Sequence, residues 1–123
     1  MTLDNDRQVI SMGISARALD GVYGTPATGL RARLEQSVDG CWLPIADAET
    51  NADGTIDDFV TGRLLRGPYR IIFDSDQYFS ALGASAAYPE IIIVFRLRSE
   101  SRTCQVQVLM TPYSYSLYFG DRA

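Results

Sequence analysis

The sequence predicts an all-β protein, an antiparallel β-sandwich with one short helix. Apolar and polar residues alternate with a period of two along several segments, as in strands that bury one face. Turn-forming glycine, proline, asparagine and aspartate separate these segments at regular intervals. The chain of 123 residues is long enough for one core. We expect a flexible N-terminus over residues 1–8 and a single domain over residues 9–123.

The first half of the chain contains four segments that we predict as strands. Residues 9–19 alternate, with Ile10, Met12, Ile14, Ala16 and Ala18 on one face and Ser11, Gly13, Ser15, Arg17 and Leu19 on the other. Residues 29–36 place Leu30, Ala32 and Leu34 inward and Arg31, Arg33 and Glu35 outward. Residues 41–49 and 54–59 are predicted as shorter strands, joined by the turn NADG. Pro44 places the first of these two at a sheet edge, because proline donates no ladder hydrogen bond.

The second half contains two strongly apolar strands and the helix. Residues 69–74 (YRIIFD) and 90–98 (EIIIVFRLR) are rich in β-branched and aromatic residues, which favour strands. Between them, residues 74–83 (DSDQYFSALG) predict a helix that begins at Asp74 or Ser75 and ends at Gly83.

The last two predicted strands carry a mixed face opposite the core. In residues 104–111 the apolar face is Cys104, Val106, Val108 and Met110, and the opposite face is Gln105, Gln107 and Leu109. Beyond the turn, Ser114, Ser116 and Tyr118 alternate with Tyr113, Tyr115, Leu117 and Phe119. A face that mixes amides, hydroxyls and leucine is typical of a solvated surface, a subunit interface or a ligand channel. The alternation alone leaves all three open.

Charge and composition exclude several classes of partner. The net charge of −4 and the pI of about 4.6 make nucleic acids and anionic membranes poor electrostatic partners. No stretch approaches the roughly 18 apolar residues of a membrane span. The start MTLDNDRQ has neither the basic nor the apolar part of a signal peptide, so we expect a cytoplasmic protein.

Few residues of the chain are suited to proton transfer or metal binding near neutral pH. Histidine is absent, which removes the usual general base and the commonest metal ligand. Cys41 and Cys104 have no metal-binding spacing, and alternation places Cys104 with the core valines. The acidic run at residues 46–58 lacks the EF-hand pattern, so we interpret it as a solvated turn. We expect neither a metal nor a cofactor.

Five pieces of the sequence, in order, resemble the transthyretin and 5-hydroxyisourate hydrolase family. They are RALDGVYGTPATGLRARLE, TNADGTI, GPYRIIFDSDQYFSALG, AYPEIIIVF and LMTPYSYSLYFG. The resemblance implies an eight-stranded sandwich that dimerises through edge strands and forms a homotetramer, a dimer of dimers with a small-molecule channel between them. It implies that the channel is lined by Arg17, Leu19, Gln105, Gln107, Leu109, Ser116 and Tyr118, and it matches Thr55 to a further site position.

The sequence departs from the hydrolase pattern at the positions that carry its chemistry. Arg17 and Gln105 stand where the hydrolase has histidines, and Thr55 stands where it has an arginine. The C-terminal Tyr-Arg-Gly-Ser becomes Tyr118, Phe119, Gly120 and Asp121. Arginine and glutamine do not activate water near neutral pH, so we expect the ordinary hydrolase activity to be absent.

Three kinds of function remain: an enzyme, a binding protein and a purely structural tetramer. In the first, an enzyme acts on a small cyclic, anionic substrate by cyclisation, isomerisation or hydrolysis: Arg17 holds the anionic group, Gln105 and Gln107 orient it, and Tyr118 or Ser116 donates a proton. Leu19, Thr55, Gln107 and Leu109 would contact the ligand. In the second, the channel only binds a small molecule. We favour the enzyme because polar donors replace both histidines.

Overall fold

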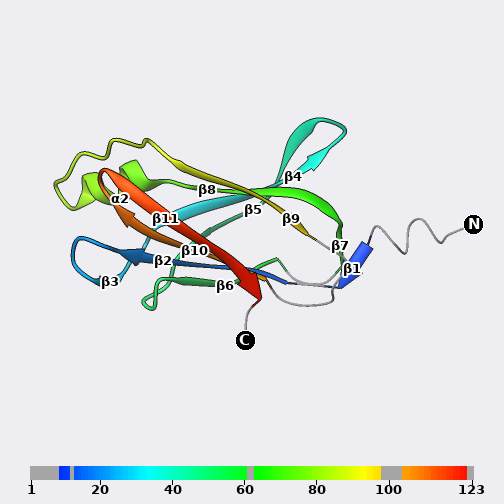
Figure 1. Cartoon of the computed structure of the whole chain (residues 1–123), viewed down its shortest axis with the longest axis horizontal. Helices are drawn as coiled ribbons and strands as arrows, with labels where there is room; N and C mark the ends of the chain where they lie inside the picture. Colours follow the sequence, from blue (N-terminus) through cyan, green and yellow to red (C-terminus); the bar gives the residue numbers. More distant parts are fainter. Residues whose placement is uncertain (1–8, 12, 61–62, 98–103, 122–123) are drawn as a thin grey trace, which may run out of the picture.

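The computed structural model describes residues 9–11, 13–60, 63–97 and 104–121. Two sheets face each other (Figure 1). One contains β2 (Ile14–Asp20), β3 (Thr25–Pro26), β6 (Thr55–Val60), β10 (Cys104–Thr111) and β11 (Ser114–Asp121), and the other contains β4 (Arg31–Val38), β5 (Cys41–Glu49), β8 (Gly67–Phe73) and β9 (Ile91–Leu97). A separate ribbon pairs β1 (Val9–Ser11) with β7 (Arg63–Leu65), and helix α2 (Ser75–Ala81) follows β8. The expected flexible segment 1–8 lies outside the described residues.

The β-sandwich with one short helix is therefore confirmed, and its strand order adds a feature that alternation does not report. The sheets have the orders β6–β2–β10–β11 and β5–β4–β8–β9, and β3 also pairs with β2. β2 and β10 run parallel, so the first sheet is mixed rather than purely antiparallel. These two strands are far apart in the sequence, and no hairpin forces them to be antiparallel.

One predicted strand was wrong. Residues 9–19 do not form one strand, because β1 pairs with β7 whereas β2 pairs with β10 and β6. Alternation indicates which face of a strand is buried, but it does not indicate which neighbouring strand it pairs with. β5 has the predicted bounds, residues 41–49, and lies at the sheet edge that Pro44 predicts.

The core lies between the two sheets and contains the residues that alternation places inward. Buried apolar side chains come from β2, β10, β4, β8 and β9; the largest that are fully buried include Tyr69, Phe73, Phe79, Ile71 and Met110. Ser15 is an exception to the pattern. It was predicted on the outward face, but it is fully buried and its hydroxyl donates to the carbonyl of Cys104 at 3.2 Å. Its strand, β2, lies between β6 and β10 inside the sheet, and its small hydroxyl is satisfied there by the backbone.

Glu35 lies on the outer face of its sheet, as predicted, but it is only 5% exposed. The guanidinium Nε of Arg70 donates to its Oε1 at 2.6 Å, and Nη1 of Arg33 lies 3.8 Å from its Oε2. Arg70 in turn lies over the ring of Trp42, 4.5 Å from the centroid. The two arginines therefore cover a carboxylate that alternation alone would place in water.

Helix α2 is fixed at one end of the sandwich by a capped N-terminus and a buried carboxylate. Asp74 is the N-cap, and its side chain accepts from the backbone N–H of Gln77 at 3.2 Å. Asp20, 1% exposed at the end of β2, accepts from the Tyr78 hydroxyl at 2.8 Å. Its other oxygen accepts from the backbone N–H groups of Val22 and Tyr23. Among the described residues, no helix is long and apolar enough to cross a membrane.

Replacing Tyr78 by phenylalanine should destabilise the fold by about 1.5 kcal/mol, because the Asp20 carboxylate then loses a hydrogen bond in a buried setting. Burial, together with the hydrogen bond and charge of Asp20, raises the pKa of Tyr78 above the ordinary 10.0. The unfolded chain therefore loses this proton first, so the contribution is complete below about pH 10 and declines as pH rises beyond it. Urea unfolding at pH 7 and at alkaline pH should show a steeper alkaline loss for the wild type than for Tyr78→Phe. Equal losses would contradict this account.

Candidate functional site

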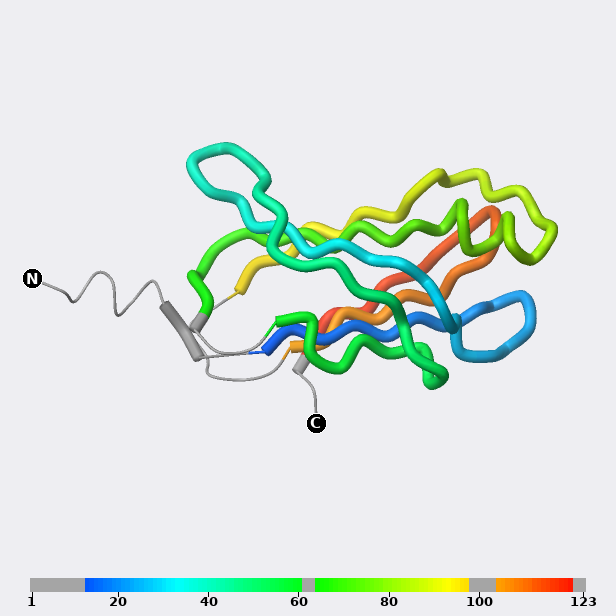
Figure 2. Tube along the Cα trace, turned by 180° about the vertical axis from the view of Figure 1, so that it is seen from behind, coloured from blue at the N-terminus to red at the C-terminus, as the bar shows by residue number. Residues whose placement is uncertain are grey.

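The predicted site residues come together on the outer face of the β6–β2–β10–β11 sheet. Strand register places Thr55 beside Arg17, Arg17 beside Gln107, and Gln107 beside Tyr118. One row therefore crosses all four strands, and we call it the Arg17 row. Figure 2 shows β11 and β10 adjacent along this layer (red and orange). The residues alternate in sequence with buried Ala16, Ala18, Val106 and Val108, so their side chains point away from the core.

Two further rows of the same face flank the Arg17 row, one on each side. The first is largely apolar and contains Leu19, Leu109 and Ser116. The second, which we call the Gln105 row, contains Ser15, Gln105 and Gly120. Leu109 is 44% exposed and Tyr118 is 60% exposed, whereas Gln105 and Gln107 are half-buried. The face thus combines a cation, two amides, hydroxyls and two leucines.

Arg17 is exposed and makes no hydrogen bond or ion pair with any residue in the described part of the chain. By contrast, Arg31, Arg33 and Arg70 each lie within 4 Å of a carboxylate. In the Arg17 row the flanking residues Thr55 and Gln107 are neutral and polar, and the nearest carboxylate that the contacts of the row show is that of Asp57, 3.1 Å from Oγ1 of Thr55. A guanidinium in such a setting offers a planar fork of donors to an incoming anion.

The two glutamines are already linked to each other. Nε2 of Gln107 donates to Oε1 of Gln105 at 2.7 Å. This contact uses the carbonyl oxygen of Gln105 and one N–H of Gln107. Within the described chain, the Gln105 N–H groups can therefore donate to a ligand, and the Gln107 carbonyl can accept from one. The pair therefore presents donors and an acceptor in fixed order beside Arg17.

Thr55 lies in the row but its hydroxyl is engaged in its own turn. Oγ1 lies 3.0 Å from Oδ1 of Asn51 and 3.1 Å from Oδ1 of Asp57. Asn51 also accepts from the backbone N–H groups of Asp53 and Thr55. Thr55 thus shapes the edge of the site and has little capacity left for a ligand. The alternation pattern does not predict this role of Asn51. The sequence feature that indicates it is an asparagine at the start of a turn.

The edge strand β11 exposes apolar residues on its inner side as well. Tyr115, Leu117 and Phe119 are exposed, although Val106, Val108 and Met110 beside them in β10 are buried. Phe119 contacts Phe95 with ring centroids 5.4 Å apart, and Tyr115 contacts Tyr88 at 5.2 Å. The edge of this sheet is therefore only partly covered by the chain itself.

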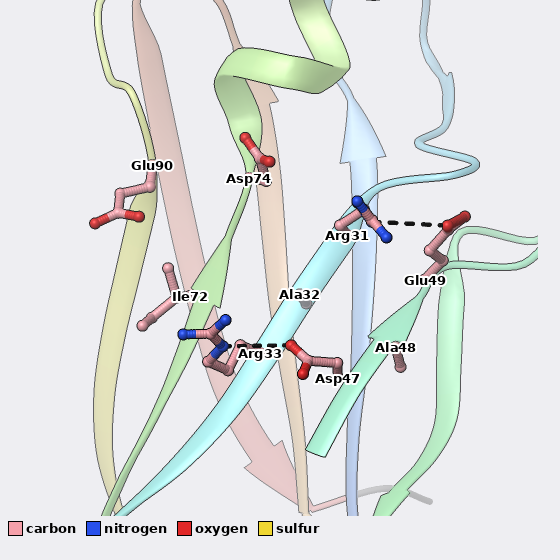
Figure 3. Close-up of a pocket in the computed structure, with 9 residues that line it drawn as sticks. All are labelled: Arg31, Ala32, Arg33, Asp47, Ala48, Glu49, Ile72, Asp74 and Glu90. Atoms are coloured by element: carbon pink, nitrogen blue, oxygen red, sulfur yellow. Dashed lines mark hydrogen bonds and ion pairs between the residues drawn. The ribbon is translucent and has the colours of Figure 1, made fainter. Parts of the chain in front are cut away.

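A hollow of about 700 Å³ lies on the other sheet, away from the Arg17 row. Figure 3 shows its lining from β4, β5 and β8, with Asp74 just after β8 and Glu90 just before β9. Arg31 pairs with Glu49 at 3.9 Å and Arg33 with Asp47 at 3.3 Å, and Asp74 is held by the helix cap. These exposed ion pairs satisfy one another, so the hollow has fewer groups free for a ligand than the Arg17 row. Within the described residues, no three His, Cys, Asp or Glu side chains cluster so as to hold a metal ion.

Comparison with known proteins places these features in a family. The profile described as "HIUase/Transthyretin family" matches residues 14–120. A 5-hydroxyisourate hydrolase of Mus musculus is 31% identical over 114 residues, 90% of this chain and 97% of that protein. A 5-hydroxyisourate hydrolase of Deinococcus radiodurans is 34% identical over 114 residues, 89% and 96% respectively. The structure of sea bream transthyretin in complex with thyroxine is similar with a TM-score of 0.84 and 28% identity, over 90% of this chain and 97% of that chain.

Proposed function

Because the chain belongs to the HIUase/transthyretin family, we propose that it is a divergent member whose site for a small cyclic anion is the Arg17 row. We propose further that it is an enzyme that cyclises, isomerises or hydrolyses this molecule. One observation carries the proposal: Arg17, which makes no ion pair with any described residue, lies in a four-strand row between Thr55 and Gln107.

The chemistry that this row supplies is positioning and charge stabilisation. Arg17 would hold the anionic group by paired hydrogen bonds, and Gln105 and Gln107 would orient the ring. Tyr118 or Ser116 would donate a proton to an atom where negative charge develops. Leu19 and Leu109 would contact the face of the ring. Cyclisation and isomerisation are better served by this row than hydrolysis, because the row holds no base to activate water.

We propose that a second dimer covers the face, in a homotetramer built through the sheet edges. Leu109 and Tyr118 are exposed on the face, and Tyr115, Leu117 and Phe119 are exposed on the edge strand. Apolar surface of this kind is typical of subunit contacts. Light scattering at micromolar concentration should give the mass of four chains, and a monomer would contradict the enclosed channel.

A binding protein without turnover is the second candidate. It is favoured by the absence of histidine from all 123 residues, because guanidinium and amide groups exchange no proton near neutral pH. Binding and turnover are separated by chromatography of the bound molecule after incubation with the protein. Conversion in proportion to protein concentration identifies an enzyme, and unchanged ligand identifies a binder.

The location of the site is tested by titrating the labelled protein with orotate, a planar ring that carries a carboxylate and two ring carbonyls. Backbone amide signals should shift in β2, β10 and β11, around Arg17 and Gln107. Benzylamine, a cyclic cation of similar size, is the matched control and should leave these signals unchanged. Shifts confined to the hollow around Arg31 and Asp47 would overturn the proposal, as would equal shifts with the cation.

Hydrolysis of 5-hydroxyisourate, the activity for which the relatives are named, should be absent near pH 7. The reason is that Arg17 and Gln105 provide no base to activate water. The decay of 5-hydroxyisourate absorbance should be the same with and without this protein, whereas the Mus musculus relative serves as the positive control. A saturable acceleration that Arg17→Ala abolishes would show that the row performs this reaction without histidine.

A further inference from the structure

Gly120 is a glycine inside a strand, where this residue is usually unfavourable. It lies in β11, opposite Gln105 of β10 and two residues beyond Tyr118, on the same outer face. Glycine within a strand weakens it and often marks a close approach by another group. The φ angle of Gly120 lies outside the left-handed region, so backbone conformation does not require glycine here.

The space beside Gly120 is occupied by a tyrosine side chain. A Cβ at this position would lie 2.5 Å from the hydroxyl oxygen of Tyr118 and 2.9 Å from its Cε2 and Cζ. Contacts this short do not occur between real Cβ atoms and their neighbours. The phenol of Tyr118 therefore lies over the bare backbone of Gly120, in the volume that any other residue would occupy.

The backbone of Tyr118 lies in the Arg17 row, but its side chain runs along β11 so that the phenol lies in the Gln105 row. The hydroxyl lies over Gly120, and the register partner of Gly120 is Gln105. The hydroxyl makes no hydrogen bond with any residue of the described chain, and the Gln105 amide has free N–H donors. Two donors are thus brought to one row, while Arg17 lies in the next.

We infer that Gly120 is a positioning residue: by leaving open the volume in which the Tyr118 phenol lies, it allows the hydroxyl to lie beside Gln105 for a ligand oxygen; this rests on the proposed function of the face. Adjacent rows are two residues apart along a strand, about 7 Å. That spacing fits one heterocycle whose anionic group binds at the Arg17 row and whose carbonyl oxygen, across the ring, binds at the Gln105 row. The substrate class is therefore a single-ring anion with an exocyclic oxygen opposite its charge.

The geometry is tested directly by NMR on protein with labelled tyrosine. The wild type should show a nuclear Overhauser effect between the Tyr118 ring protons and the α-protons of Gly120. In Gly120→Ala the Tyr118 ring signals should shift while the other tyrosines keep theirs, because the exposed phenol swings aside and the strand stays in place. Absence of the wild-type effect overturns the inference whether or not a ligand binds.

The functional consequence is tested with orotate in a double-mutant cycle. Gly120→Ala should weaken orotate binding about tenfold at an unchanged melting temperature, and Tyr118→Phe, which keeps the ring, should weaken it similarly. In a Tyr118→Ala background the change at 120 should have no further effect. A further tenfold loss in that background would show that Gly120 affects binding independently of the Tyr118 side chain, and it would overturn the inference. If orotate does not bind the wild type, the proposed function fails for this probe, and the NMR result alone decides the role of Gly120.

Discussion

Replacing Arg70 by methionine should lower the free energy of unfolding by about 3 kcal/mol, the largest effect we expect from removing one polar side chain. The change leaves the Glu35 carboxylate buried without its 2.6 Å partner. Arg33 remains at 3.8 Å, which keeps the loss at the lower end of the range for a broken buried pair. The contact with the Trp42 ring is lost as well. Urea unfolding at pH 7 measures the difference.

The matched control is Arg31→Met in the same strand layer. Arg31 lies 3.9 Å from Glu49, and both side chains are exposed, so this change should cost less than about 1 kcal/mol. The double variant Arg70→Met with Glu35→Leu should recover much of the lost stability, because it leaves no buried charge. Equal effects of Arg70→Met and Arg31→Met would show that Glu35 is solvated in the folded protein.

The inward and outward positions of most strands could be predicted from alternation alone. In β10 the parity of Cys104, Val106, Val108 and Met110 matches their burial, and it separates Gln105 and Gln107 from the core. The pattern is decisive there because each strand buries one face against the opposite sheet. The N-cap was predicted as Asp74 or Ser75 from local sequence chemistry, and Asp74 is the residue that caps the helix.

Features that depend on contacts between distant segments could not be predicted. Glu35 looks exposed by parity, but it is covered by Arg70, 35 residues away. The change of pairing partner between β1 and β2 leaves the alternation of residues 9–19 intact. The Thr55 hydroxyl is occupied by Asn51, which no periodicity reports.

The candidate site shows the same division. Alternation places Arg17, Gln107 and Tyr118 on outward faces, but only the strand register shows that they occupy one row. The sequence also contains Gly120 without any sign that a phenol lies over it; that contact depends on the rotamer of Tyr118. Arg17 is the residue on which the proposed site depends most.

Arg17→Ala should weaken orotate binding by about 1.5–3 kcal/mol, the range for hydrogen bonds to a charged group, which corresponds to roughly 10- to 150-fold in the dissociation constant. The fold should be unaffected, because the side chain is exposed and makes no ion pair within the described residues. In the proposed tetramer the copies of this cation would lie near one another around the channel, so its removal should also relieve repulsion and slightly raise the melting temperature. Calorimetric titration and thermal unfolding measure the two effects.

Arg96→Ala is the matched control for Arg17→Ala. Arg96 is likewise exposed and without an ion pair in the described chain, but it lies on β9 of the other sheet. The Arg96→Ala substitution removes the same charge as Arg17→Ala. Any loss of orotate affinity that the two variants share therefore reflects the electrostatic field of the whole protein. We expect the wild type to lose affinity as salt rises and Arg17→Ala to lose much less, because the screened contact is gone. If Arg17→Ala unfolds while each folded molecule keeps normal affinity, Arg17 is structural and the row is no anion site.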